Sequence, residues 1–200
     1  MLRNKSILSN KICKRENKWH GELGAIYSVD FWNSTRKLYA KINIDNRLLW
    51  LQFQIVRNSL QTNYIVSHFM RNVSPLCDYC QESNELVSHL YWLCNIVRIF
   101  LQEVTSYFEQ FNFSFIPSKT QMLFGFLDKE ITDPKNFITL VLKRYIWITK
   151  FKTKQLNMNG FKSFLNSYVV DLKYIFELKN DKDDATNSTE WNAISNALSA

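Results

Sequence analysis

Apolar positions along most of this chain recur every three or four residues, the spacing that places them on one face of an α-helix. One such stripe runs through Leu48, Leu51 and Ile55. Asp45 or Asn46, just before it, can cap its first turn. A second stripe occupies Leu86, Leu90, Leu93, Val97, Leu101, Val104 and Phe108. Both patterns predict amphipathic helices that bury one face.

Proline and glycine mark where the later helices begin and end. Pro134 suits a first helical position and Asp133 can cap it, so we expect a helix from there to about Gln155. Another helix is expected over residues 161–178, after Gly160. Four glycines and three prolines are too few for the many tight turns of a β-sandwich. The pattern therefore predicts a mainly α fold.

Changes in composition divide the chain into four segments. Residues 1–28 form a basic arm that we expect to be flexible, and residues 29–112 form a helical module that contains a cysteine cluster. Residues 113–178 form a basic and aromatic helical region. Residues 179–200 form a polar tail that we expect to be disordered. Hydrophobic residues make up 46% of the chain, enough for a substantial core.

Positive charge is unevenly distributed within the net charge of +7. Residues 1–20 carry six Lys or Arg and one Glu, and residues 143–162 carry six more with no acidic residue. These six are Lys143, Arg144, Lys150, Lys152, Lys154 and Lys162. Segregated positive charge suits a polyanion, because neutralised phosphates release counterions. On charge alone, nucleic-acid binding and a merely solubilising basic surface stay equally good interpretations.

The hydropathy pattern shows neither a secretory signal nor a membrane-spanning segment. The basic N-terminus lacks the apolar stretch of a secretory signal. The most apolar run, FITLVLKRYIWI, is interrupted by Lys143 and Arg144 and is too short for a membrane span. We therefore expect an intracellular protein, in nucleus or cytoplasm, that is not secreted, has no membrane partner and keeps its thiols reduced.

Three of the four cysteines and one histidine lie within eighteen residues, with the spacing C-x2-C-x8-H-x4-C. The residues are Cys77, Cys80, His89 and Cys94. Thiolates and imidazole at such spacings are typical of small structural zinc sites. Four protein ligands leave no position for a reactive water, so the expected zinc supports structure only. A disulfide does not suit reduced thiols, a catalytic Cys–His pair lacks a carboxylate partner, and chance clustering stays an alternative.

The last two ligands impose a condition on the backbone. Residues five apart on an unbroken α-helix point about 140° away from each other, so His89 and Cys94 could not both reach one metal ion. The zinc hypothesis therefore predicts that the helix ends or distorts near Leu93. Asn95 can cap a new helix that starts at Ile96.

The cluster lies within a wider frame of residues. The frame consists of Leu49-Trp50, Thr62-Asn63, Ser74-Pro75-Leu76-Cys77, Cys80, Glu85, His89-Leu90, Trp92 and Cys94. It resembles the zinc-binding region near the C-terminus of reverse transcriptases from LINE-type (non-LTR) retrotransposons, over about residues 30 to 110. The basic and aromatic residues 143–165 are similar to the helix that often follows in those proteins. Asn95 stands where that family often has proline.

The resemblance implies a small helical domain stapled by a Cys-Cys-His-Cys zinc knuckle, and a module that grips template RNA or target DNA with low specificity. Its expected phosphate contacts are Arg57, Arg71, Lys143, Arg144, Lys150, Lys152 and Lys154. Between these, Tyr145 is expected in the core, whereas Trp147 and Phe151 could pack inside or stack on bases.

Catalysis is not expected from this chain. The Asp-Asp hairpin that reverse transcriptases need has no counterpart, since Asp183-Asp184 lie in the polar tail, and no endonuclease metal site is evident. Two other interpretations stay open. The chain could be a zinc-stapled module that docks on the reverse transcriptase domains of a parent polyprotein, or a remnant coding fragment without selected activity.

Overall fold

The computed structural model describes residues 16–40, 45–179 and 189–200, the side chains of 175–179 excepted. Its helices are α1 (Lys18–Leu23), α2 (Val29–Ala40), α3 (Asn46–Val56), α4 (Asn63–Ser67), the π-helix η1 (His89–Leu93), α5 (Asn95–Glu109), α6 (Lys119–Phe124), α7 (Pro134–Lys152), α8 (Met158–Lys179) and α9 (Thr189–Ser199). Within the described ranges, β-structure is limited to one isolated bridge between Leu76 and Asn84. The predicted mainly α fold is confirmed.

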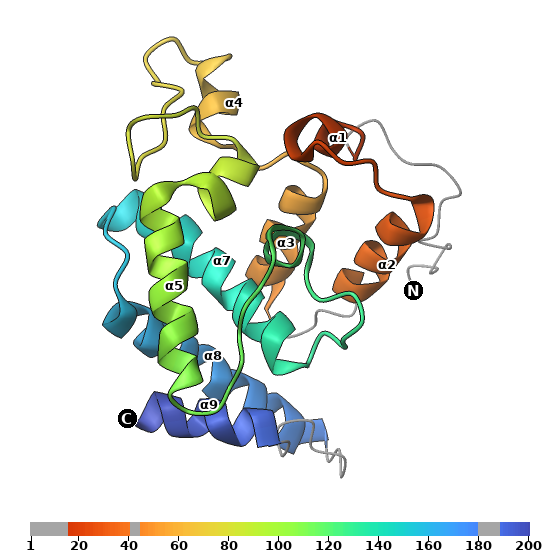
Figure 1. The fold of residues 1–200 in the computed structure, drawn as a ribbon, viewed down its shortest axis with the longest axis vertical. Coiled ribbons are helices and arrows are strands. Elements are labelled where there is room, and N and C mark those ends of the chain that lie inside the picture. Colours follow the sequence, from red (N-terminus) through yellow and green to blue (C-terminus); the bar gives the residue numbers. More distant parts are fainter. Residues whose placement is uncertain (1–15, 41–44, 180–188) are drawn as a thin grey trace.

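Helix α7 runs through the middle of the molecule (Figure 1) and packs against α3, α8 and α9. It is apolar on nearly every side, with Phe137, Val141 and Ile146 fully buried, as expected of a helix inside a core. Its start matches the prediction: Pro134 is the first residue, and the Asp133 side chain accepts a hydrogen bond from the Lys135 amide at 2.9 Å.

Around α7, one hydrophobic core joins residues from both predicted helical regions. Tyr145 shows the connection, because its ring contacts Phe100 of α5 at 5.8 Å and Phe161 of α8 at 5.5 Å between centroids. The expectation that Tyr145 is buried is confirmed. None of the described helices combines the length and apolar character that a membrane span requires.

The expected flexible arm is wrong for residues 16–23, which include α1. Trp19 is fully buried, and its Nε1 donates a hydrogen bond to the Val56 carbonyl at 2.9 Å. Glu16 is also buried and forms an ion pair with Arg36 at 2.7 Å. A buried tryptophan and a buried carboxylate join this segment to the core despite its basic composition. Residues 1–15, which include Cys13, lie outside the described residues.

The expected disordered tail is wrong for residues 189–199, which form α9. Trp191, Ile194 and Ala197 recur every three residues and are all buried. The Trp191 ring meets the edge of Phe137 at 5.2 Å, and its Nε1 donates to the Thr132 carbonyl at 3.2 Å. A short apolar stripe in a polar segment suffices because α9 contacts α5, α7 and α8. The other tail residues, 180–188, lie outside the described residues.

Candidate metal centre

The first two cysteines lie in a tight loop between α4 and η1. The Cys77 amide donates to the Ser83 carbonyl and the Gln81 amide to the Cys77 carbonyl, both at 2.9 Å. Gln81 adopts a positive φ of 57°, and the bridge between Leu76 and Asn84 closes the loop. These contacts fold the backbone so that Cys77 and Cys80 face the same point.

The second pair of side chains comes from η1 and its end. The Cys94 amide donates to the His89 carbonyl at 2.9 Å, the five-residue hydrogen bond of a π-helix. Cys94 itself is extended, with φ −61° and ψ 125°, and α5 begins at Asn95. The predicted break between His89 and Cys94 is confirmed, and a π-turn supplies the distortion. The Asn95 side chain accepts from the Ile96 amide at 2.8 Å.

The four ligand atoms all lie within 4.8 Å of one another. Cys77 Sγ lies 3.9 Å from Cys94 Sγ, and Cys80 Sγ lies 3.4 Å from His89 Nε2. Zinc–sulfur and zinc–nitrogen bonds of about 2.3 and 2.0 Å give tetrahedral edges of about 3.8 Å between two sulfurs and about 3.5 Å between sulfur and nitrogen. The four predicted ligands are therefore brought together, and they can bind a metal ion.

Hydrogen bonds within the cluster shift the pKa values of Cys77, Cys94 and His89. A hydrogen bond with Cys94, together with burial, raises the pKa of Cys77 to about 12. The same hydrogen bond lowers the pKa of Cys94, and a hydrogen bond with Cys77 raises the pKa of His89 despite its burial. A metal ion must displace the protons of these groups, so its affinity should fall as the pH falls.

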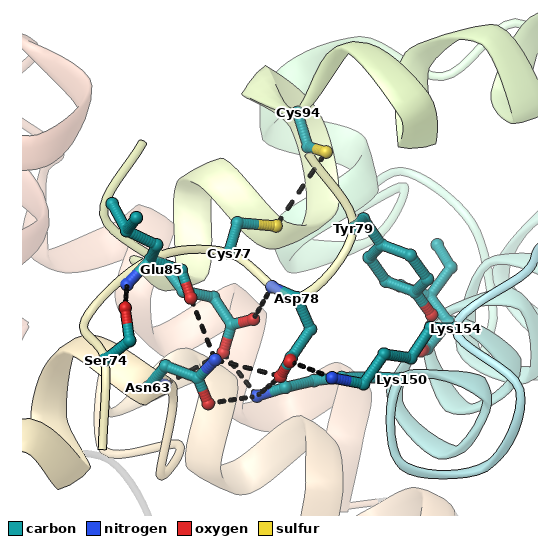
Figure 2. Close-up of polar contacts among 11 residues, drawn as sticks. Asn63, Ser74, Cys77, Asp78, Tyr79, Glu85, Cys94, Lys150 and Lys154 are labelled. Carbon is teal, nitrogen blue, oxygen red and sulfur yellow. Dashed lines mark hydrogen bonds and ion pairs between the residues drawn. The ribbon is translucent and has the colours of Figure 1, made fainter. Parts of the chain in front are cut away.

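The loop of residues 77–84, called the metal loop below, packs against a network of buried acidic and basic side chains (Figure 2). Glu85 is fully buried, and its carboxylate accepts from the Asn63 amide at 2.9 Å and the Asp78 amide at 3.3 Å. Lys150 of α7, equally buried, forms an ion pair with Glu85. Burial of a carboxylate is tolerated only with such pairing and hydrogen bonding. The loop is thereby fastened to α7, 65 residues further along the chain.

Asp78, between the two loop cysteines, extends this network. It lies 3.7 Å from the ammonium of Lys150 and 2.6 Å from that of Lys154, and Asn63 donates to it at 2.9 Å. Partial burial alone would raise the pKa of Asp78, but the hydrogen bonds from Lys154 and Asn63 and the charge of Lys150 lower it. Tyr79 adds a further tie to α7, because its hydroxyl donates to the Ile146 carbonyl at 2.6 Å.

Two of the expected phosphate contacts are wrong. Lys143 is buried, with its ammonium directed to the side-chain oxygen of Gln52 and the Leu123 carbonyl, and burial lowers its pKa well below the usual value. Lys150 is buried in the network with Glu85. Neither side chain can reach a phosphate. The sequence pattern included Glu85 but assigned it no function. In the structure, Glu85 is the buried acidic partner of Lys150.

The other expected contacts lie at the surface. Arg71 and Lys152 are exposed, and Arg57 is exposed with its guanidinium 4.6 Å from the centre of the Phe53 ring. Arg144 is half-buried. Lys154 is exposed but is paired with Asp78.

Known proteins add no assignment to this geometry. No protein-family model matches the chain, and no curated protein matches it. The features that bear on function are the cluster of four side chains that could bind a metal ion, the ionic network that joins its loop to α7, and the basic side chains at the surface.

Proposed function

We propose that this chain is a zinc-stabilised nucleic-acid-binding module with no catalysis of its own, equivalent to the C-terminal zinc-binding region of a non-LTR retrotransposon reverse transcriptase. Its role would be to grip template RNA or target DNA for the polymerase. Three cysteine thiols and an imidazole that lie within 4.8 Å of one another favour zinc among the metal ions available to proteins. Since all four positions are protein side chains, the ion would hold the loop rather than activate water.

The observation that carries nucleic-acid binding is a set of basic side chains with no acidic partner. Arg57, Arg71, Arg144 and Lys152 form no ion pair with any described residue. Unpaired cations on a protein of net charge +7 attract a polyanion and release its counterions on contact. These four side chains are expected phosphate contacts that stay possible once the buried Lys143 and Lys150 are excluded.

The test is the affinity of the zinc-loaded chain for labelled single-stranded RNA and DNA at increasing salt. A phosphate binder should lose affinity steeply between about 50 and 200 mM salt. Absence of binding at the low-salt end, or binding that ignores salt, would refute the proposal. Zinc content per chain, measured on the same preparation, tests the identity of the metal separately.

A second candidate function is docking on the reverse transcriptase domains of a parent polyprotein. The observation in its favour is an apolar stripe beside the metal centre, Leu93, Ile96 and Ile99, whose side chains are 51%, 38% and 55% exposed. Exposed apolar residues grouped in this way often mark protein contacts. Such docking would bury apolar surface and would change little over the same salt range, so the titration separates the two functions.

A further inference from the structure

A groove between α3 and α7 combines aromatic rings with guanidinium groups. Its volume is about 440 Å³, within the range of about 300–1,000 Å³ for ligand pockets. The side chains that matter in it are Arg47, Trp50, Gln54, Gln61, Arg144 and Trp147. None of the described residues that line it is acidic. None of the four candidate metal ligands is among its lining residues.

The aromatic side chains of the groove are unusually available. Trp50 is 60% exposed, and its ring stacks on that of Phe53 with 5.5 Å between centroids and 17° between planes. Trp147 is half-buried and contacts Phe151 edge to face at 5.0 Å. The neighbouring rings hold both indoles in place. Trp50 therefore presents a positioned ring to solvent, on which a base could stack. Trp147 presents only the part of its ring that lies open to the groove, because the Lys150 ammonium lies 5.0 Å from its ring centre.

The two helices carry these residues in the same order. On α3 the sequence runs Arg47, Trp50 and Phe53, and on α7 it runs Arg144, Trp147 and Phe151. Steps of three or four residues place each set along one side of its helix, and α3 packs beside α7. The groove is thus lined by one arginine and one tryptophan from each helix, Arg47 and Trp50 of α3 and Arg144 and Trp147 of α7.

The charges of the groove favour an anion. Arg144 lines the groove and is half-buried, and it makes no hydrogen bond or ion pair with a described residue, so a ligand in the groove could pair with it. Arg47 is held by Asp45 at 3.0 Å, and Asp171 also influences it electrostatically. Asp45 in turn accepts from the Tyr168 hydroxyl at 2.9 Å. Asp45 and Asp171 thus offset the positive charge of Arg47 at one end of the groove. The positive charge of the groove that has no ion pair with a described residue is that of Arg144.

We propose that this groove binds unpaired nucleotides of a single-stranded nucleic acid, with bases stacked on Trp50 and Trp147 and a phosphate on Arg144. The inference rests on the proposed function and names its contact surface. Stacking requires a base whose face is free, which a duplex does not offer, and it is tolerant of sequence. The amides of Gln54 and Gln61 can both donate and accept at base edges. Alternating rings and cations are how single-strand grooves bind.

The experiment measures the affinity of the zinc-loaded full chain for a labelled oligo(U) of about twelve nucleotides. A duplex of the same length is the competitor, at roughly 100 mM salt. The groove variants are Trp50→Ala and Arg144→Gln. The matched controls are Phe69→Ala, which removes an 84% exposed ring elsewhere, and Arg98→Gln, which removes an exposed arginine on α5. Trp50→Phe retains a stacking face.

Each groove variant should weaken oligo(U) binding about tenfold, while Trp50→Phe and the controls should stay within about twofold of wild type. Quenching of tryptophan fluorescence by oligo(U) should shrink in Trp50→Ala. If the wild type binds oligo(U) but groove and control variants behave alike, the groove is refuted and the proposed function stands. Equal affinity for the duplex would also refute it. If the wild type binds no single strand, both proposals fail.

Discussion

The metal loop and the α3–α7 groove both depend on α7, but they use its basic side chains in opposite ways. Toward the loop, Lys150 is buried and neutralised by Glu85. Toward the groove, Arg144 is half-buried and has no acidic partner among the described residues. The adjacent Lys143 is turned into the core, about 100° around the helix from Arg144. A run of basic residues on one helix thus divides into structural cations and cations available to a ligand.

The strongest test of this comparison removes the metal. Cys94→Ser should abolish metal binding and cost about 4 kcal/mol of unfolding free energy, as loss of a structural metal does. Denaturant unfolding with metal analysis measures both quantities. Cys13→Ser is the control, since Cys13 is the one cysteine that does not belong to the C-x2-C-x8-H-x4-C set, and this variant should retain the metal ion. Retention of one metal ion per chain in Cys94→Ser would contradict the ligand assignment.

The next effect comes from the cation that fastens the loop to α7. Lys150→Met leaves the carboxylate of Glu85 buried without its ion pair, which should cost about 3 kcal/mol. Denaturant unfolding of the metal-loaded chain provides the measurement. Lys154→Met is the matched control, because its ammonium is exposed although it also pairs with Asp78, and it should change stability little. Equal losses would show that burial does not distinguish the two lysines.

Lys143 should give a smaller and pH-dependent effect. Burial lowers its pKa in the folded state, so the unfolded chain binds more protons between that lowered pKa and about 10.4. Stability contributed by this group therefore rises with pH across that window. The wild type should gain stability relative to Lys143→Met as the pH rises through the alkaline range below about 10. A difference between the two unfolding curves that is constant with pH would contradict the buried assignment.

The smallest effect is expected at Lys152. Its side chain is exposed and forms no ion pair with a described residue, so Lys152→Gln should leave unfolding unchanged within about 0.5 kcal/mol. Loss of one phosphate contact would lower the slope of log affinity against log salt by about one. A salt titration with single-stranded RNA measures the slope. An unchanged slope would remove Lys152 from the phosphate contacts and leave Arg144 as the α7 cation to examine.

The cluster of three cysteines and one histidine could be predicted from sequence because its members are close together along the chain. Cys77, Cys80, His89 and Cys94 lie within eighteen residues, and helix geometry alone required a distortion between the last two. The structure supplies that distortion as a π-turn. The cap and first residue of α7, Asp133 and Pro134, were predictable for the same reason, since a capping hydrogen bond joins residues two or three positions apart.

Burial of single side chains could not be predicted in this way. Lys143 and Lys150 read as surface cations because their partners, Gln52 and Glu85, are 91 and 65 residues away. Trp19 and Trp191 lie in polar segments, and their partners Val56 and Thr132 are also distant in the chain. The sequence by itself determined the mainly helical fold, the start of α7, the clustering of the four candidate ligands and the break between the last two, because these follow from spacing along the backbone. Only the tertiary structure decided which cations and rings are buried, because that depends on which distant surfaces meet across the core.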